Sequence, residues 1–167
     1  MKRLVIGRGS VFADLLIVGE APGEKEDLEG KPYVGKSGKL LNELLKQSGI
    51  DYQEDVYFCN VIKCRPPQNR RPTIKEINIH KPWVLQQIKL VDPKYIILTG
   101  SIAMRTILEV KNPISKLRGK WIKKDGREIM TIFHPSYLLR FHSKQSEKPY
   151  DLTLRDLTNV SSKLYAL

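Results

Sequence analysis

The sequence predicts an α/β fold in which helices cover both faces of a parallel sheet. Three short apolar runs, at residues 14–18, 56–62 and 94–100, have the composition of buried strands. Longer segments with apolar residues at helical spacing separate these runs. Alternating strands and helices favour repeated strand–helix–strand units, in which the strands lie parallel and the helices pack on the sheet.

Two helices are predicted between these strands. Four leucines between positions 40 and 45 form an apolar stripe within residues 36–49, which a glycine closes. Thr73 and Glu76 form a capping box that opens a second helix, running to about Val91. Because Pro82 lies inside that segment, we expect a kink or a break there.

The rest of the chain continues the alternation. Ser101 follows the third strand and is expected to cap a short helix that ends at position 108. Two short strands flank Asp125-Gly126, which is a strong hairpin signal. A last helix is predicted at about residues 150–165. Three polar motifs follow strand ends, namely 19–23, Asn60 with its loop, and 134–136, and we expect them to converge in one cleft.

Length and composition predict one domain over residues 1–167, with a core of ordinary size. Hydrophobic residues make up 41% of the chain and charged residues 28%, as in globular proteins. No apolar run approaches the roughly 20 residues of a membrane helix, and no signal-peptide pattern is present. A cytoplasmic location is therefore expected.

The charge balance predicts a polyanionic partner. Lys and Arg number 29 against 18 Asp and Glu, a net charge of +11. Nucleic acid is the favoured partner, and a basic surface without a specific partner is the alternative. An anionic membrane is disfavoured because no basic amphipathic helix stands out. Cys59 and Cys64 fit neither a four-cysteine metal site nor a disulfide framework, so we expect buried thiols.

Residues 30–37 match the phosphate-binding pattern G-x-x-x-x-G-K-[ST]. A true site of this kind joins a buried strand directly to a helix, but the preceding residues 24–29 are acidic and polar. A strand that ends in a metal-binding aspartate is also missing. Nucleotide hydrolysis is therefore disfavoured, and binding of a DNA phosphate at the helix N-terminus stays open.

Four segments, in this order and spacing, resemble family 4 uracil-DNA glycosylases over residues 14–140. They are Gly19–Asp27, Gly30–Gly35, Asn60–Pro67 and His134–Arg140. The resemblance implies a three-layer α/β/α sandwich with a central, mostly parallel four-stranded sheet. It also implies a monomeric DNA repair enzyme that flips uracil out of single- or double-stranded DNA and hydrolyses its N-glycosidic bond.

The resemblance assigns the reading of uracil to Asn60, whose amide offers an acceptor and donors to O4 and N3–H. Tyr33 stands where the family usually has Phe, stacking on the flipped base. The alternative for Asn60 is a turn residue at the end of a strand, and the alternative for Tyr33 is an aromatic side chain packed in a loop. The remaining residues expected to contact substrate are Gly19, Ala21, Pro22, Gly23 and Asp27.

His134 is expected near uracil O2, where a hydrogen-bond donor stabilises the charge that develops on the base. A structural turn residue before proline is the alternative. Glu20 is the candidate for positioning the attacking water, because Ala21 stands where the family 1 enzymes have an aspartate. Glu26 also matches the family motif, and a solvated acidic loop is its alternative interpretation.

Contact with DNA is expected from the basic loop after the second strand and from the segment after His134. Apolar side chains at 138 and 139 either wedge into a base step or belong to the core. Basic side chains meet phosphates. The expected set is Lys36, Ser37, Lys63, Arg65, Arg70, Arg71, Ser136, Tyr137, Leu138, Leu139 and Arg140.

The chain departs from the family at the [4Fe–4S] cluster, which usually rests on four cysteines. No C-x-x-C pair is present, Cys64 matches the third ligand, and His80 stands at the fourth. We therefore expect no cluster, no other cofactor and no metal. A covalent histidine insertion known from a sister group is absent from residues 68–72, so turnover is expected. A non-catalytic DNA-binding relative stays open as an alternative.

Overall fold

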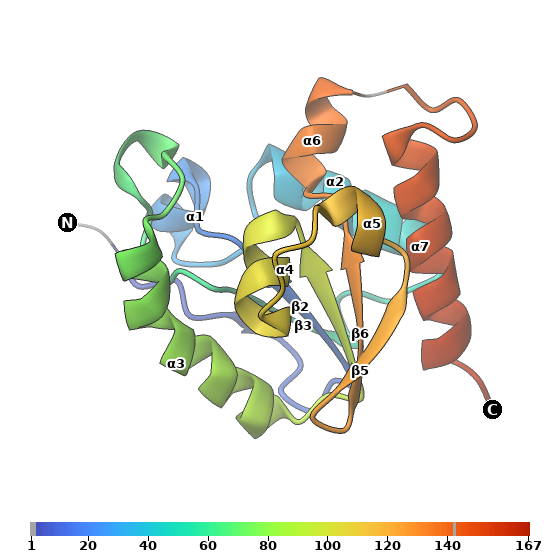
Figure 1. Ribbon diagram of the computed structural model, residues 1–167, viewed down its shortest axis with the longest axis horizontal. Helices are drawn as coiled ribbons and strands as arrows, with labels where there is room; N and C mark the ends of the chain where they lie inside the picture. The colour runs from blue at the N-terminus through green and yellow to red at the C-terminus, as the bar shows by residue number, and fades with distance from the viewer. Residues whose placement is uncertain (1–2, 142) are drawn as a thin grey trace.

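Six strands form one mixed sheet in the computed structural model, which describes residues 3–141 and 143–167 (Figure 1). Their order is β1-β3-β2-β4-β6-β5. The four central strands run parallel, and both edge strands are antiparallel to their neighbours. The strands are β1 (Arg8–Gly9), β2 (Leu15–Gly19), β3 (Val56–Asn60), β4 (Tyr95–Thr99), β5 (Trp121–Lys124) and β6 (Arg127–Ile132).

The predicted parallel sheet is confirmed, but the predicted number of four strands is wrong. The four parallel strands are the centre of a wider sheet. β1 is only two residues long, too short to leave a periodic pattern in the sequence. β5 joins the opposite edge through the predicted hairpin, whose turn residues Asp125 and Gly126 both have positive φ, as a type I′ turn requires.

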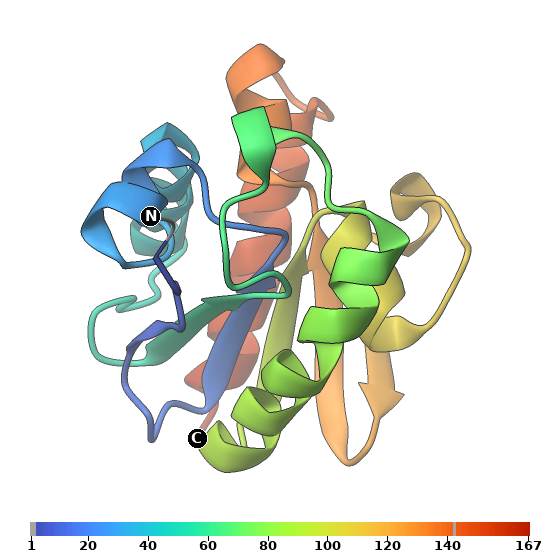
Figure 2. The same cartoon turned by 90° about the vertical axis from the view of Figure 1, so that its left-hand side faces the viewer.

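Helices cover both faces of the sheet (Figures 1 and 2). Along β2, Leu15 and Ile17 point to one face and share a core with α2 (Lys36–Gln47) and α7 (Pro149–Leu164). Leu16 and Val18 point to the other face and share a second core with α3 (Ile74–Val91) and α4 (Ser101–Leu108). The alternation along one strand thus builds the three layers.

Two local expectations need correction: α3 has no break at Pro82, and Ser101 is not the N-cap of α4. α3 continues through Pro82 without a break. The carbonyl that proline leaves without a donor belongs to Asn78, which is exposed and therefore open to water. Ser101 is the first residue of α4, and Gly100, at φ 89°, takes the N-cap position. Within the described part of the chain, no helix is long and apolar enough to cross a membrane.

Four short elements lie in the connections and were not predicted. They are α1 (Glu24–Glu29), the 3₁₀ turn η1 (Pro67–Asn69), α5 (Ile114–Leu117) and α6 (Pro135–Arg140). Three of them, α1, η1 and α6, follow the carboxyl ends of β2, β3 and β6. These ends share one edge of the sheet, at the upper side of Figure 1, where parallel α/β proteins bind their ligands.

Candidate active site

A cavity of about 420 Å³ opens at this edge of the sheet. Glu20 after β2, Asn60 at the end of β3 and His134 after β6 all line it. The predicted convergence of the three strand-end motifs is therefore confirmed. Ala21, Pro22, Gly23, Tyr33, Ser37 and Ser136 also line the cavity, as do Arg70, Arg71 and Arg140.

Asn60 is the last residue of β3 and only 4% exposed. Its carboxamide forms no hydrogen bond with the described residues, so it is available to a ligand in the cavity. Gly19, the last residue of β2, lies opposite Asn60 in the sheet. A Cβ at Gly19 would lie 2.5 Å from Asn60 Oδ1 and 2.1 Å from Tyr33 Oη. Only glycine leaves room for both groups here.

The Tyr33 ring is buried beside the cavity, and hydrogen bonds hold both its hydroxyl and its backbone. Its hydroxyl hydrogen bonds to Thr99 Oγ1 at 3.0 Å. The Arg8 guanidinium donates to the carbonyls of Pro32 at 2.7 Å and Tyr33 at 3.2 Å. These anchors hold a backbone with φ 58°, which is unusual for a tyrosine. Arg8 reaches this loop from β1, and no motif in the sequence indicates that role.

His134 caps α6 and is fixed in one tautomer. Its Nδ1 accepts a hydrogen bond from the Ser136 backbone N–H at 3.1 Å and lies 2.6 Å from Ser136 Oγ. Burial lowers the pKa of His134 to about 4. The ring is therefore neutral near pH 7, and because Nδ1 is an acceptor, the proton resides on Nε2. The Nε2–H group can therefore donate a hydrogen bond while the ring carries no positive charge.

Glu20 lies half-buried in the cavity wall. Burial raises the pKa of its carboxyl, and the nearby positive charge of Arg71 partly offsets that effect. A carboxylate with a raised pKa is a better proton acceptor than an exposed one. The position and the environment both fit a group that accepts a proton from water.

Glu26 joins two of the loops that form the cavity. Its carboxylate accepts hydrogen bonds from Gly23 N at 3.1 Å, Val34 N at 3.2 Å and Gly35 N at 2.6 Å. Two of these amides, Val34 N and Gly35 N, belong to residues 30–37 and are therefore not free to bind a nucleotide phosphate there. The neighbouring Asp27, an expected substrate contact, does not line the cavity and accepts a hydrogen bond from Arg3 N at 2.9 Å.

Comparison with known proteins is decisive for the family. Residues 6–158 match the model of the uracil DNA glycosylase superfamily. A type-4 uracil-DNA glycosylase of Thermotoga maritima is 41% identical over 163 residues, covering 95% of this chain and 82% of that protein. The chain belongs to the type-4 uracil-DNA glycosylase family. Type-4 enzymes of Archaeoglobus fulgidus and Pyrobaculum aerophilum are each 36% identical, covering 95% and 92% of this chain and 82% of each relative.

The expected DNA-facing basic residues of this type-4 family member differ in whether another side chain already binds them. Arg71 and Arg140 line the cavity mouth and form no ion pair with the described residues. Arg70 is paired with Glu76 through two hydrogen bonds of 2.9 and 2.8 Å, so its charge is balanced. Arg65 Nε donates to Asn69 Oδ1 at 2.7 Å and shapes the loop around η1. Lys36 is exposed at the start of α2.

The two leucines of α6 have different environments. Leu138 is 1% exposed and packs in the core with α2, so the wedge interpretation is wrong for it. Leu139 is 42% exposed and available to a base step. Tyr137 stacks between Phe133 and Phe141, with ring centroids 5.2 and 4.7 Å apart. This aromatic row supports the helix that carries Leu139.

Lys63 does not face DNA. Its side chain is 3% exposed, so the expected phosphate contact is wrong. The ammonium donates to the carbonyl of Asn60 at 2.5 Å and to Gln87 Oε1. The sequence placed this lysine in a basic loop and gave no sign that its side chain turns back into the protein.

The residues at the expected cluster position do not fit an iron–sulfur cluster. His80 Nδ1 accepts a hydrogen bond from Lys63 N at 3.0 Å. Among residues 3–141 and 143–167, no group of three or more His, Cys, Asp or Glu is arranged to hold a metal ion. Burial raises the pKa of the Cys59 thiol to about 11, which keeps it protonated. Two candidate side chains, Cys64 and His80, are too few ligands for a four-ligand cluster.

Proposed function

We propose that this chain hydrolyses the N-glycosidic bond between uracil and deoxyribose in DNA, leaving an abasic site for base excision repair. The observation that carries the proposal is the meeting of three groups in one cavity of a type-4 family member. They are neutral His134, half-buried Glu20 and the Asn60 carboxamide, which forms no hydrogen bond with any described residue. A cavity of about 420 Å³ has room for a single flipped base.

Asn60 reads the base in this proposal. Its amide N–H donates to uracil O4 and its Oδ1 accepts from N3–H. Cytosine carries an amino donor in place of O4, so it would set two donors against each other. The Tyr33 ring packs against the face of the base. Gly19 leaves the space in which both side chains meet the substrate.

The chemistry rests on the opposite roles of His134 and Glu20. When the bond from uracil N1 to C1′ breaks, the electron pair leaves with the base and negative charge gathers at O2. The Nε2–H of His134 donates to O2 and stabilises that charge. Water held by Glu20 forms the new bond to C1′ and gives one proton to the carboxylate, while the uracil anion takes a proton from solvent.

The deciding experiment measures alkali-sensitive scission of a labelled oligonucleotide with one uracil. We expect scission only at uracil, and weak scission in Glu20→Ala, Asn60→Ala and His134→Ala. Glu24→Ala is the matched control, because Glu24 is exposed on α1 and does not line the cavity. Binding without scission on both single- and double-stranded substrate would leave a non-catalytic DNA-binding relative. Strand preference, monomeric state and cytoplasmic location stay predictions of the sequence.

A further inference from the structure

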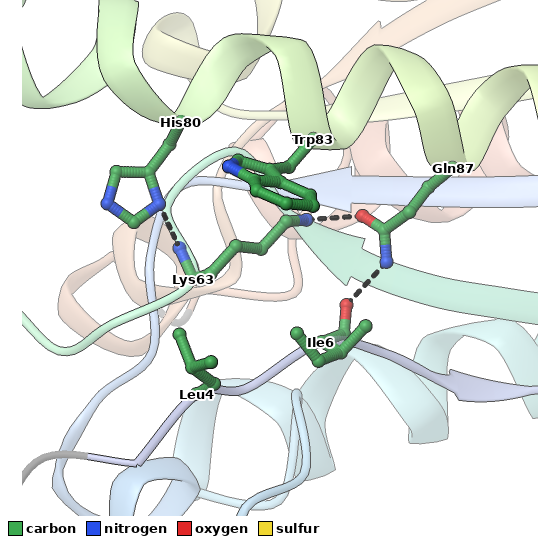
Figure 3. A pocket seen from close by; sticks show the side chains of 6 residues that line it. All are labelled: Leu4, Ile6, Lys63, His80, Trp83 and Gln87. Carbon is green, nitrogen blue, oxygen red and sulfur yellow. Dashed lines mark hydrogen bonds between the residues drawn. The ribbon is translucent and has the colours of Figure 1, made fainter.

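Lys63 is a buried lysine whose backbone N–H, backbone carbonyl and ammonium all form hydrogen bonds. Figure 3 shows the bonds to His80 and Gln87. Its backbone N–H donates to His80 Nδ1 at 3.0 Å, and its carbonyl accepts from Val5 N at 2.7 Å. Its ammonium donates to the Asn60 carbonyl and to Gln87 Oε1. These bonds tie the N-terminal segment, the end of β3 and α3 to one residue.

The Asn60 carbonyl lies beyond the reach of the edge strand. Pairing of β1 with β3 ends at Arg8 and Phe58, two residues before Asn60. A carbonyl at a buried strand end needs a donor from elsewhere. The Lys63 ammonium supplies that donor at 2.5 Å, because the chain turns back on itself within three residues.

Gln87 fixes the direction of the ammonium. Its Oε1 accepts from Lys63 Nζ, while its Nε2 donates to the Ile6 carbonyl at 2.7 Å. Because both ends of the amide are engaged, the amide cannot rotate without losing one bond. Figure 3 shows this relay from α3 through Gln87 to Lys63 and Ile6.

The ammonium has neutral partners only. Lys63 forms no ion pair with any residue in the part of the chain that the structure describes, and burial lowers its pKa. An apolar side chain of similar length would avoid the desolvation of a buried charge. The feature that an apolar side chain cannot reproduce is the donor directed at the Asn60 carbonyl.

We propose that Lys63, oriented by Gln87, is a positioning residue that fixes the main chain of Asn60 and so the carboxamide that reads uracil. The proposal rests on the proposed excision of uracil. Lys63 touches no substrate and acts only through Asn60. Displacements of about 1 Å at a substrate-reading group lower rates by roughly a hundredfold, so a rigid main chain matters here.

The test compares Gln87→Met and Lys63→Met with Gln86→Met, an exposed neighbour on the same helix. We expect kcat/KM for uracil excision to fall about tenfold in Gln87→Met, as for one lost hydrogen bond to a charged group. In Lys63→Met, kcat/KM should fall further because the Asn60 carbonyl then loses its donor, and excision is measured well below the melting temperature of each variant. Gln86→Met should match the wild type. Gln87→Glu keeps an acceptor for Lys63 but has no donor for the Ile6 carbonyl, so it should recover only part of the rate lost in Gln87→Met.

A double-mutant cycle separates positioning from general support of the fold. In the Asn60→Ala background, Gln87→Met should cause no further loss of excision, because the residue through which it acts is gone. Equal factors in both backgrounds overturn the proposal, as does wild-type activity in Gln87→Met. If the wild type itself excises no uracil, the proposed function fails, and that result is distinct from an active wild type whose Gln87 variants are unaffected.

Discussion

At Glu20 and His134, burial moves two pKa values in opposite directions. The pKa of the Glu20 carboxyl is raised, and the pKa of His134 is lowered to about 4. Low dielectric disfavours the charged form of each group. The carboxyl therefore stays protonated to a higher pH than usual, and the imidazole stays neutral down to a lower pH than usual. Near neutral pH the site therefore contains a carboxylate acceptor and a neutral donor, the combination that the proposed reaction needs.

The first prediction concerns acid pH. We expect excision to fall as the pH drops through the raised pKa of Glu20, because a protonated carboxyl cannot accept a proton from water. Arg71→Ala removes the positive charge that lowers this pKa, so the fall should begin at a higher pH. Single-turnover rates over a pH series measure the shift. Arg70→Ala is the control, because Arg70 is paired with Glu76. A profile that Arg71→Ala leaves unmoved would contradict the role of Arg71.

The second prediction concerns Gly19. A methyl group there would lie 2.1 Å from Tyr33 Oη, whose hydroxyl is bonded to Thr99. We expect Gly19→Ala to lower the excision rate by roughly a hundredfold, because both Tyr33 and Asn60 must move. Adding Tyr33→Phe removes the nearer clashing atom and should restore part of the rate. An equal defect in the double variant would show that the clash with the hydroxyl is not the cause.

Single-residue signals in the sequence located the site but not its supports. Glu20 and His134 follow predicted strands, and Asn60 lies near the carboxyl end of one. A parallel sheet brings these strand ends together whatever the loops do. Arg8, Glu26 and Gln87 act through hydrogen bonds to backbone atoms of distant segments. Such partners leave no local pattern. Lys63 was misplaced because a lysine in a polar loop has the same sequence signature whether it turns outward or inward.

Among the elements, α6 presents two leucines in adjacent positions with opposite environments. The third prediction uses this pair. Leu138→Ala should lower the free energy of unfolding by about 2–5 kcal/mol, because it leaves a cavity between α6 and α2. Leu139→Ala should change it by roughly 0.5 kcal/mol or less. Chemical denaturation measures both.

Excision by the same two variants tests the wedge. Leu139→Ala should slow excision from duplex DNA more than from single strands, because only the duplex needs its base stack opened. Leu138→Ala should show no such difference between substrates below its melting temperature. Equal slowing of both substrates by Leu139→Ala would remove the wedge role.

Long elements were predictable and short ones were not. The capping box at Thr73 and Glu76 and the Asp125-Gly126 turn are local devices, and both are present as predicted. α1, η1 and α6 span six residues or fewer, too few for a periodic pattern. Residues of these three short elements line the cavity. Sequence periodicity is therefore least informative for the segments that form the site.

For the whole molecule, the net charge of +11 gives the fourth prediction. Affinity for DNA should fall linearly on a log–log plot against salt, with a slope set by the number of phosphates contacted. Arg140→Ala should reduce that slope by about one. Lys123→Ala, on the edge strand β5 away from the cavity, should leave the slope unchanged. Fluorescence titrations at several salt concentrations measure both slopes, and equal slopes for all three proteins would exclude Arg140 from the contact.

The order of strands in the sheet also bears on synthesis of the chain. β6 lies inside the sheet between β4 and β5, although it is made after every other central strand. His134 comes two residues later, and α7, which covers the core behind it, comes last. A chain still emerging from the ribosome therefore holds an unfinished sheet with an open edge at β4. That edge is covered only when β6 has been made, so His134 cannot join Glu20 and Asn60 at the same end of the sheet before that step.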